Sequence, residues 1–80
     1  MNADKYIPIM CHNYAERAEI IKKLNDVNIQ TTRVGKSEER LLAYFSKDSE
    51  LVFIRKLLTK YGLIDEEPYF LSPKQQRMIR

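Results

Sequence analysis

The sequence predicts an α+β domain in which four strands and two helices follow one another in the order βαββαβ. Apolar residues recur at helical spacing in two segments, and β-branched or aromatic runs lie before, between and after them. The chain has 80 residues, of which 44% are apolar and 31% charged, a composition that supplies one core and a hydrated surface. We expect residues 1–71 to form this domain and residues 72–80 to form a basic C-terminal helix or tail.

The first half of the chain predicts a strand, a helix and a second strand. Residues 5–11 form a short β-like run. Asn13 is a suitable N-cap and Glu16 stands at the third helical position, which resembles a capping box at the start of a helix over residues 14–25. Residues 28–34 show the alternation of a half-buried strand. The core-facing stripe of the helix is predicted to be Tyr14, Ala18, Ile21 and Leu24.

The second half predicts a hairpin, a helix and a last strand. Residues 35–39 form a polar connection, and residues 40–46 are apolar on both faces, as in a central strand. Ser46 or Asp48 can cap the second helix, and Gly62 suits the left-handed position after its end. A last strand is predicted at 69–71. The buried stripe of the second helix is predicted to be Leu51, Ile54, Leu57, Leu58 and Tyr61.

This element order is that of the ferredoxin-like plait, an antiparallel sheet with two helices on one face. That fold places the first strand in the interior of the sheet, where backbone N–H groups donate to the strands on both sides. Pro8 has no N–H and so cannot contribute such a hydrogen bond. Two arrangements would accommodate Pro8. Either it lies at a bulge, or the fourth strand, preceded by Pro68, is missing and the first strand forms an edge.

The net charge of +3 comes from the C-terminal segment alone. Residues 1–71 hold eleven Lys or Arg and eleven Asp or Glu, so the excess is Lys74, Arg77 and Arg80. Ser72 can cap a short helix in which Met78 and Ile79 are apolar. We expect this helix to dock on an apolar surface, and a frayed basic end is the alternative.

The sequence favours a protein without catalysis, cofactor or metal. Cys11 and His12 are adjacent in a predicted extended segment, where successive side chains point to opposite faces, and the chain has no second His. Two glycines cannot build a phosphate-binding loop, and residues 65–67 are expected to be a hydrated acidic loop. A single Cys favours a reducing, cytoplasmic location, and no apolar run is long enough to span a membrane.

Two families share the predicted element order. The strand–helix junction "MCHNYA" is similar in place to the metal loop of heavy-metal-associated domains, but it lacks the second thiolate of their Met-x-Cys-x-x-Cys signature. The predicted third strand "RLLAYFS" is similar in place to the one that binds bases in RNA-recognition domains, but it lacks their basic-Gly-aromatic pattern. We treat both resemblances as topological, and neither predicts a ligand here.

The predicted function is binding through the sheet face that the helices leave open. Alternation places five mostly apolar side chains there, which the chain itself, a second copy in a homodimer or another protein must cover. We expect a small regulatory protein, an inhibitor or adaptor, that occludes or bridges a protein partner. The predicted open face is Tyr6, Pro8, Met10, Leu42 and Tyr44, and the predicted partner contacts are Tyr6, Met10, Leu42 and Tyr44 together with Met78 and Ile79.

Two other functions are compatible with the sequence. The first is RNA or DNA binding by cations of the second helix and the tail, because clustered cations attract phosphates. Its residues would be Arg55, Lys56, Lys60, Lys74, Arg77 and Arg80. The second, weaker alternative is a fragment of a catalytic assembly whose site is completed by another chain.

Overall fold

The computed structural model describes residues 3–72, and within them the six predicted elements are all present. The predicted C-terminal helix, with Lys74, Arg77, Met78, Ile79 and Arg80, lies outside the described residues. The elements are β1 (Lys5–Met10), α1 (Tyr14–Asp26), β2 (Thr31–Arg33), β3 (Arg40–Phe45), α2 (Asp48–Tyr61) and β4 (Tyr69–Phe70).

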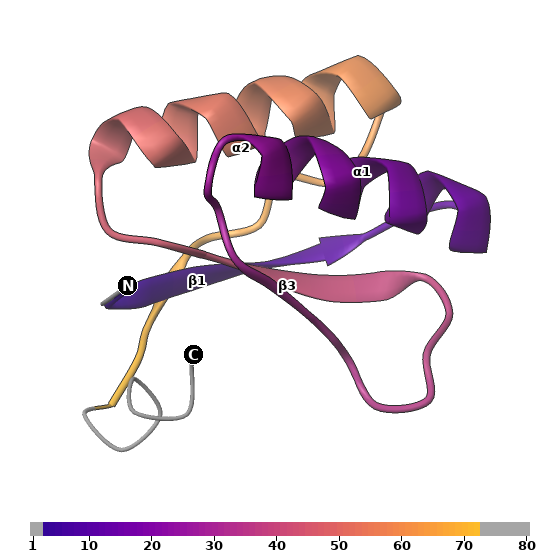
Figure 1. The fold of residues 1–80 in the computed structure, drawn as a ribbon, viewed down its shortest axis with the longest axis horizontal. Helices are drawn as coiled ribbons and strands as arrows, with labels where there is room; N and C mark the ends of the chain where they lie inside the picture. Colours follow the sequence, from indigo (N-terminus) through magenta and orange to yellow (C-terminus); the bar gives the residue numbers. More distant parts are fainter. Residues whose placement is uncertain (1–2, 73–80) are drawn as a thin grey trace.

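The strands form one antiparallel sheet in the order β2-β3-β1-β4. Both helices lie on the same side of this sheet, and the opposite side carries no helix among the described residues (Figure 1). The α+β prediction is therefore confirmed, and the arrangement is compatible with a ferredoxin-like plait.

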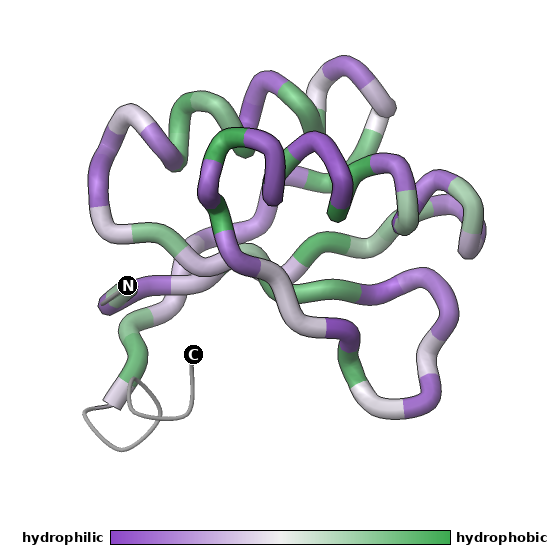
Figure 2. The backbone as a smooth tube through the Cα atoms, in the orientation of Figure 1, coloured by the Kyte–Doolittle hydropathy of each residue, from purple (hydrophilic) through white to green (hydrophobic). Residues whose placement is uncertain are grey.

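The core lies between the sheet and the helices. Side chains of β1 and β3 alternate between the two sheet faces, so every second residue points toward α1 and α2. Along the helices, apolar residues likewise alternate with polar ones (Figure 2). The buried core consists of Ile7, Ile9, Cys11, Ile20, Leu24, Ile29, Leu41, Ala43, Phe45, Ile54, Leu57 and Leu58.

The predicted core-facing stripe of α1 is confirmed at Leu24, which is buried, and at Ile21, which packs against the core, but it is wrong in the first half of the helix. Tyr14 is 54% exposed and Ala18 is exposed, whereas Arg17 is only 4% exposed, beside the buried Ile20 and Leu24. The first half of the stripe was wrong because the prediction counted Arg17 as a surface cation. Its long aliphatic stem can pack in the core while its guanidinium reaches polar groups beyond it.

The helix ends follow the predicted signals with two shifts. Asn13 Oδ1 accepts a hydrogen bond from the Glu16 backbone N–H at 2.8 Å and caps α1, but the Glu16 carboxylate caps the backbone N–H of His12. The N-cap of α2 is Lys47, not the predicted Ser46 or Asp48. Its N–H donates to the carboxylate of Glu50, in the first turn of the helix, at 2.9 Å.

The end of α2 is confirmed as predicted. Gly62 adopts a left-handed φ of 69°, and the backbone N–H of Leu63 donates to the carbonyl of Leu58 at 2.8 Å. Leu63 then packs against the core, which completes a Schellman-type ending.

Pro8 lies in a central strand, yet its missing N–H costs no hydrogen bond to β3. The N–H of Cys11 donates to Glu39 beside β3, and the carbonyl of Asp4 accepts from Leu71 beside β4. Odd-numbered residues of β1 therefore bond toward β3 and even-numbered ones toward β4, so Pro8 points toward β4. Because β4 pairs only with Lys5 and Tyr6, it does not reach Pro8. The fourth strand forms and β1 is not an edge.

Candidate binding surface

The open sheet face is hollowed at one end. We call this feature the hollow, a recess of about 420 Å³ over the C-terminal half of β1 and the start of β3. Its floor is apolar, and Met10 on that floor is 38% exposed. It is lined by Tyr6, Pro8, Ile9, Met10, Val34, Arg40, Leu41, Leu42, Glu66 and Tyr69. The structure thus brings together three of the predicted partner contacts, Tyr6, Met10 and Leu42.

The fourth predicted contact within the described residues, Tyr44, lies at the closed end of the same face. Its exposed fraction is 8%, because Ala3 and Leu71 pack beside it in a small second cluster. Tyr6 and Leu42 border this cluster as well as the hollow. The chain therefore covers one end of the open face itself, and the hollow remains at the other end.

Three tyrosines stand along the open face. The Tyr6 ring stacks on the Tyr69 ring, with centroids 5.3 Å apart and planes at 18°, and is tilted toward Tyr44 with centroids 6.3 Å apart. Tyr69 is 51% exposed. Because Tyr69 already covers one face of the Tyr6 ring, a ligand in the hollow would contact the exposed Tyr69 ring and the edge of Tyr6.

Arg17 fixes the loop that borders the hollow. Its Nη1 donates to the carbonyl of Ser37 at 2.5 Å and to the carbonyl of Arg40 at 3.2 Å, so α1 is joined to the loop after β2 and to the first residue of β3. The guanidinium also lies 5.4 Å from the centre of the Tyr14 ring. The exposed Tyr14 ring thus packs over the buried guanidinium of Arg17.

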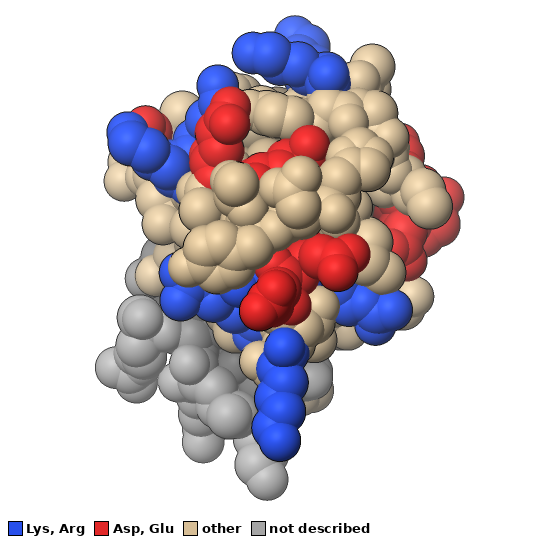
Figure 3. Space-filling view, turned by 90° about the vertical axis from the view of Figure 1, so that its right-hand side faces the viewer, with Lys and Arg blue, Asp and Glu red and all other residues tan. Residues whose placement is uncertain are grey.

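The basic end of α2 is partly neutralised. Arg55 Nε donates to Asp65 at 3.1 Å, and Lys56 and Lys60 are exposed. Seen from the end that carries the loop between β2 and β3, cations and carboxylates are mixed, and neither sign dominates that face (Figure 3). This distribution offers no continuous basic track for a nucleic-acid backbone on the face shown.

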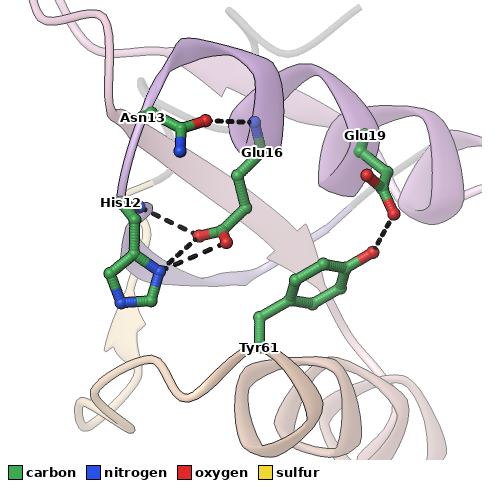
Figure 4. Close-up of polar contacts among 5 residues, drawn as sticks. All are labelled: His12, Asn13, Glu16, Glu19 and Tyr61. Atoms are coloured by element: carbon green, nitrogen blue, oxygen red, sulfur yellow. Dashed lines mark hydrogen bonds and ion pairs between the residues drawn. The ribbon is translucent and has the colours of Figure 1, made fainter.

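The Cys11–His12 pair is not arranged as a nucleophile and base. Cys11 is 2% exposed, and its burial, reinforced by the Glu16 carboxylate, raises the pKa of the thiol from 9.0 to about 11. The exposed His12 instead places Nδ1 2.9 Å from a Glu16 carboxylate oxygen (Figure 4). The thiol thus stays protonated at neutral pH, which is the inactive form for nucleophilic attack.

Another polar contact joins α1 to α2. Tyr61 of α2 donates its hydroxyl hydrogen to the Glu19 carboxylate of α1 (Figure 4). Because this hydrogen bond favours the protonated hydroxyl, it is the main reason why the pKa of Tyr61 is raised to about 12. Tyr61 packs against the core from its edge, so the contact holds α1 beside α2 at their exposed rim.

Within residues 3–72, no three side chains of His, Cys, Asp and Glu gather closely enough to hold a metal ion. Neither helix of that part of the chain is long and apolar enough to cross a membrane. Comparison of the chain with protein families, with curated proteins and with solved structures finds no match.

Sequence reasoning did not anticipate six residues that line the hollow, of which two, Ile9 and Leu41, belong to the core-facing side of β1 and β3. The other four come from segments that the predicted strand pairing leaves unspecified: the residue after β2, the start of β3, and the segment before and within β4. These four are Val34, Arg40, Glu66 and Tyr69. Alternation along β3 could have placed Arg40 on the open face, because it is two residues from Leu42. No sequence signal indicates Glu66.

Proposed function

We propose that this chain is a non-enzymatic binding protein, built on a ferredoxin-like plait, that takes a segment of a partner protein into the hollow. One observation carries the proposal. The apolar floor around Met10 and Leu42 is left uncovered by the described chain, whereas the Tyr44 end of the same face is closed. Apolar recesses with a polar rim are characteristic of interaction sites. By filling the hollow, the partner segment would be occluded or bridged to a further molecule.

The chemistry of the hollow favours a protein segment over a nucleic acid. Its lining is mostly aliphatic, and its two charges, Arg40 and Glu66, are of opposite sign, so the lining has no net positive charge to attract a phosphate backbone. The stacking surface of Tyr6 is shared with Tyr69, and Arg55 on α2 is engaged by Asp65. A protein segment with an apolar side chain, by contrast, would gain from burying it against Met10 and Leu42.

The test is a selection of displayed random peptides on the immobilised full-length chain, followed by NMR titration of the labelled protein with an enriched peptide. We expect the largest shift changes at Tyr6, Met10 and Leu42. Met10→Lys should weaken binding about tenfold or more, since burying a side chain of this size contributes about 1.5–3 kcal/mol. Val52→Lys is the matched control, because Val52 is 52% exposed on α2 and away from the hollow.

Several results would contradict the proposal. No enriched peptide, or binding that survives both Met10→Lys and Leu42→Lys with the circular-dichroism signal intact, would exclude the hollow as the site. Binding of a single-stranded oligonucleotide that weakens steeply with salt and shifts Lys56 and Lys60 would favour the nucleic-acid alternative.

A further inference from the structure

Two charges of opposite sign border the hollow on opposite sides. Arg40 begins β3, whereas Glu66 lies in the connection from α2 to β4, beyond the other edge of β1. Because the strand order is β2-β3-β1-β4, the cation stands on the β3 side and the carboxylate on the β4 side. Between them lies the apolar floor of Pro8, Met10 and Leu42.

The positive charge of Arg40 is available to a ligand. Its side chain is exposed, and within residues 3–72 it forms no ion pair, although Glu38 and Glu39 precede it in the chain. Its backbone is nevertheless fixed. The N–H donates to Ser37 Oγ at 3.2 Å, and the carbonyl accepts from Arg17 Nη1 at 3.2 Å. The base of the side chain is therefore held in place before any ligand arrives.

The negative charge of Glu66 is similarly uncommitted. The residue is partly buried at the rim, and none of the cations among residues 3–72 pairs with it. The nearby Arg55 is engaged by the neighbouring carboxylate of Asp65 at 3.1 Å. A carboxylate partly removed from water beside an apolar floor gains more from a cation than a fully exposed one does.

We propose that the hollow selects a segment of dipolar charge pattern, and this inference rests on the proposed function. The segment brings an apolar side chain onto Met10 and Leu42, a carboxylate toward Arg40 and a cation toward Glu66. The floor supplies the binding free energy, while the two flanking charges set the direction in which the segment lies and exclude segments of the reverse pattern.

Charge reversal tests the inference in the full-length chain. Peptides selected on the wild type should share an apolar residue with an acidic residue on one side and a basic residue on the other. Arg40→Glu should weaken them about fivefold and shift selection toward a base on the first side. Glu66→Lys should do the same on the second side. The matched controls are Lys36→Glu and Glu67→Lys, because both residues are exposed and neither lines the hollow.

A charge swap between peptide and protein tests the contact with Arg40 most directly. A peptide whose acidic residue is replaced by Lys should bind Arg40→Glu better than wild type. Peptides that need Met10 but show no charge pattern would overturn this inference alone, whereas an absence of peptides would overturn the proposed function.

Two other occupants of the hollow can be recognised by NMR. Concentration-dependent shifts at Met10 and Leu42 without peptide would assign the hollow to a second copy. Nuclear Overhauser contacts from Met78 or Ile79 to Met10 would assign it to the chain itself. Either result would overturn the inference.

Discussion

Replacing Arg17 by Met removes the contact between α1 and the loop that borders the hollow while keeping most of the buried aliphatic volume. Hydrogen bonds from a charged donor contribute about 1.5–3 kcal/mol each to stability. Arg17 makes two, but the Arg40 carbonyl keeps a second donor, the backbone N–H of Val34 at 3.4 Å. Only the Ser37 carbonyl loses the interaction in full.

An opposing effect reduces this loss. A buried cation with no carboxylate partner among residues 3–72 carries a desolvation cost, and Met avoids that cost. Weighing one full and one partial hydrogen bond against this gain, we expect Arg17→Met to lower the free energy of unfolding by about 2 kcal/mol. For a domain of this size the melting temperature should fall by roughly 8–16 °C.

Urea and thermal unfolding followed by circular dichroism measure the effect. Arg33→Met is the matched control, since Arg33 is exposed on β2, and we expect a change within about 0.5 kcal/mol. Arg17→Lys keeps the charge but lacks the forked donor, and it should fall between the wild type and Arg17→Met. If Arg17→Met were as stable as the wild type or more stable, desolvation of the cation would outweigh its hydrogen bonds. The reasoning would then be refuted.

Three further predictions concern single groups. The pKa of Tyr61 is raised to about 12, so its contact with Glu19 should stabilise the fold below pH about 10 and be lost as the pH rises through 12. Glu19→Gln should return the tyrosinate absorbance titration toward pH 10, and an unchanged curve would contradict this assignment. Cys11 should resist alkylation by iodoacetamide at neutral pH until urea unfolds the protein, and rapid labelling of the native state would show that the thiol is accessible. Pro8→Ala should change the free energy of unfolding by less than about 1 kcal/mol, because the new N–H points to an edge that β4 does not reach. A larger loss in urea titration would mean that the proline ring itself supports the sheet.

The elements of the fold could be predicted because their signals are local. The stripe of α2 and the left-handed Gly62 lie within a few residues of each other, and both are confirmed. The strand β3, apolar on both faces, was likewise placed correctly in the interior of the sheet. These features depend on spacing along the chain, which the sequence displays directly.

The role of Arg17 could not be predicted, because it depends on contacts between distant segments. Periodicity treats arginine as polar and assigns it to the surface. Its burial depends instead on the carbonyls of Ser37 and Arg40, which face the helix only after the loop has folded beside it. The hollow was missed for the same reason, since Glu66 and Tyr69 meet Met10 only through the pairing of β1 with β4.

Pro8 explains why β4 stops short of the hollow. If the β1–β4 register continued beyond Tyr6, Glu67 would face Pro8, which has no N–H to donate, so that pair would lose one of its two hydrogen bonds. Pro68 does not oppose pairing with β1, because by the same alternation its nitrogen points to the outer edge of the sheet, where it removes a donor.

The chain therefore joins the sheet only at Tyr69, and the preceding segment passes the end of β1 with Glu66 at the rim of the recess. The opposite wall is held by Arg17 through the Ser37 and Arg40 carbonyls. One wall is thus set by the point at which β4 begins and the other by the Arg17 side chain, and neither depends on the apolar floor. It follows that substitutions at the exposed floor residue Met10 can change the affinity of the hollow while its walls stay in place, so the binding experiments can separate a lost contact from a lost shape.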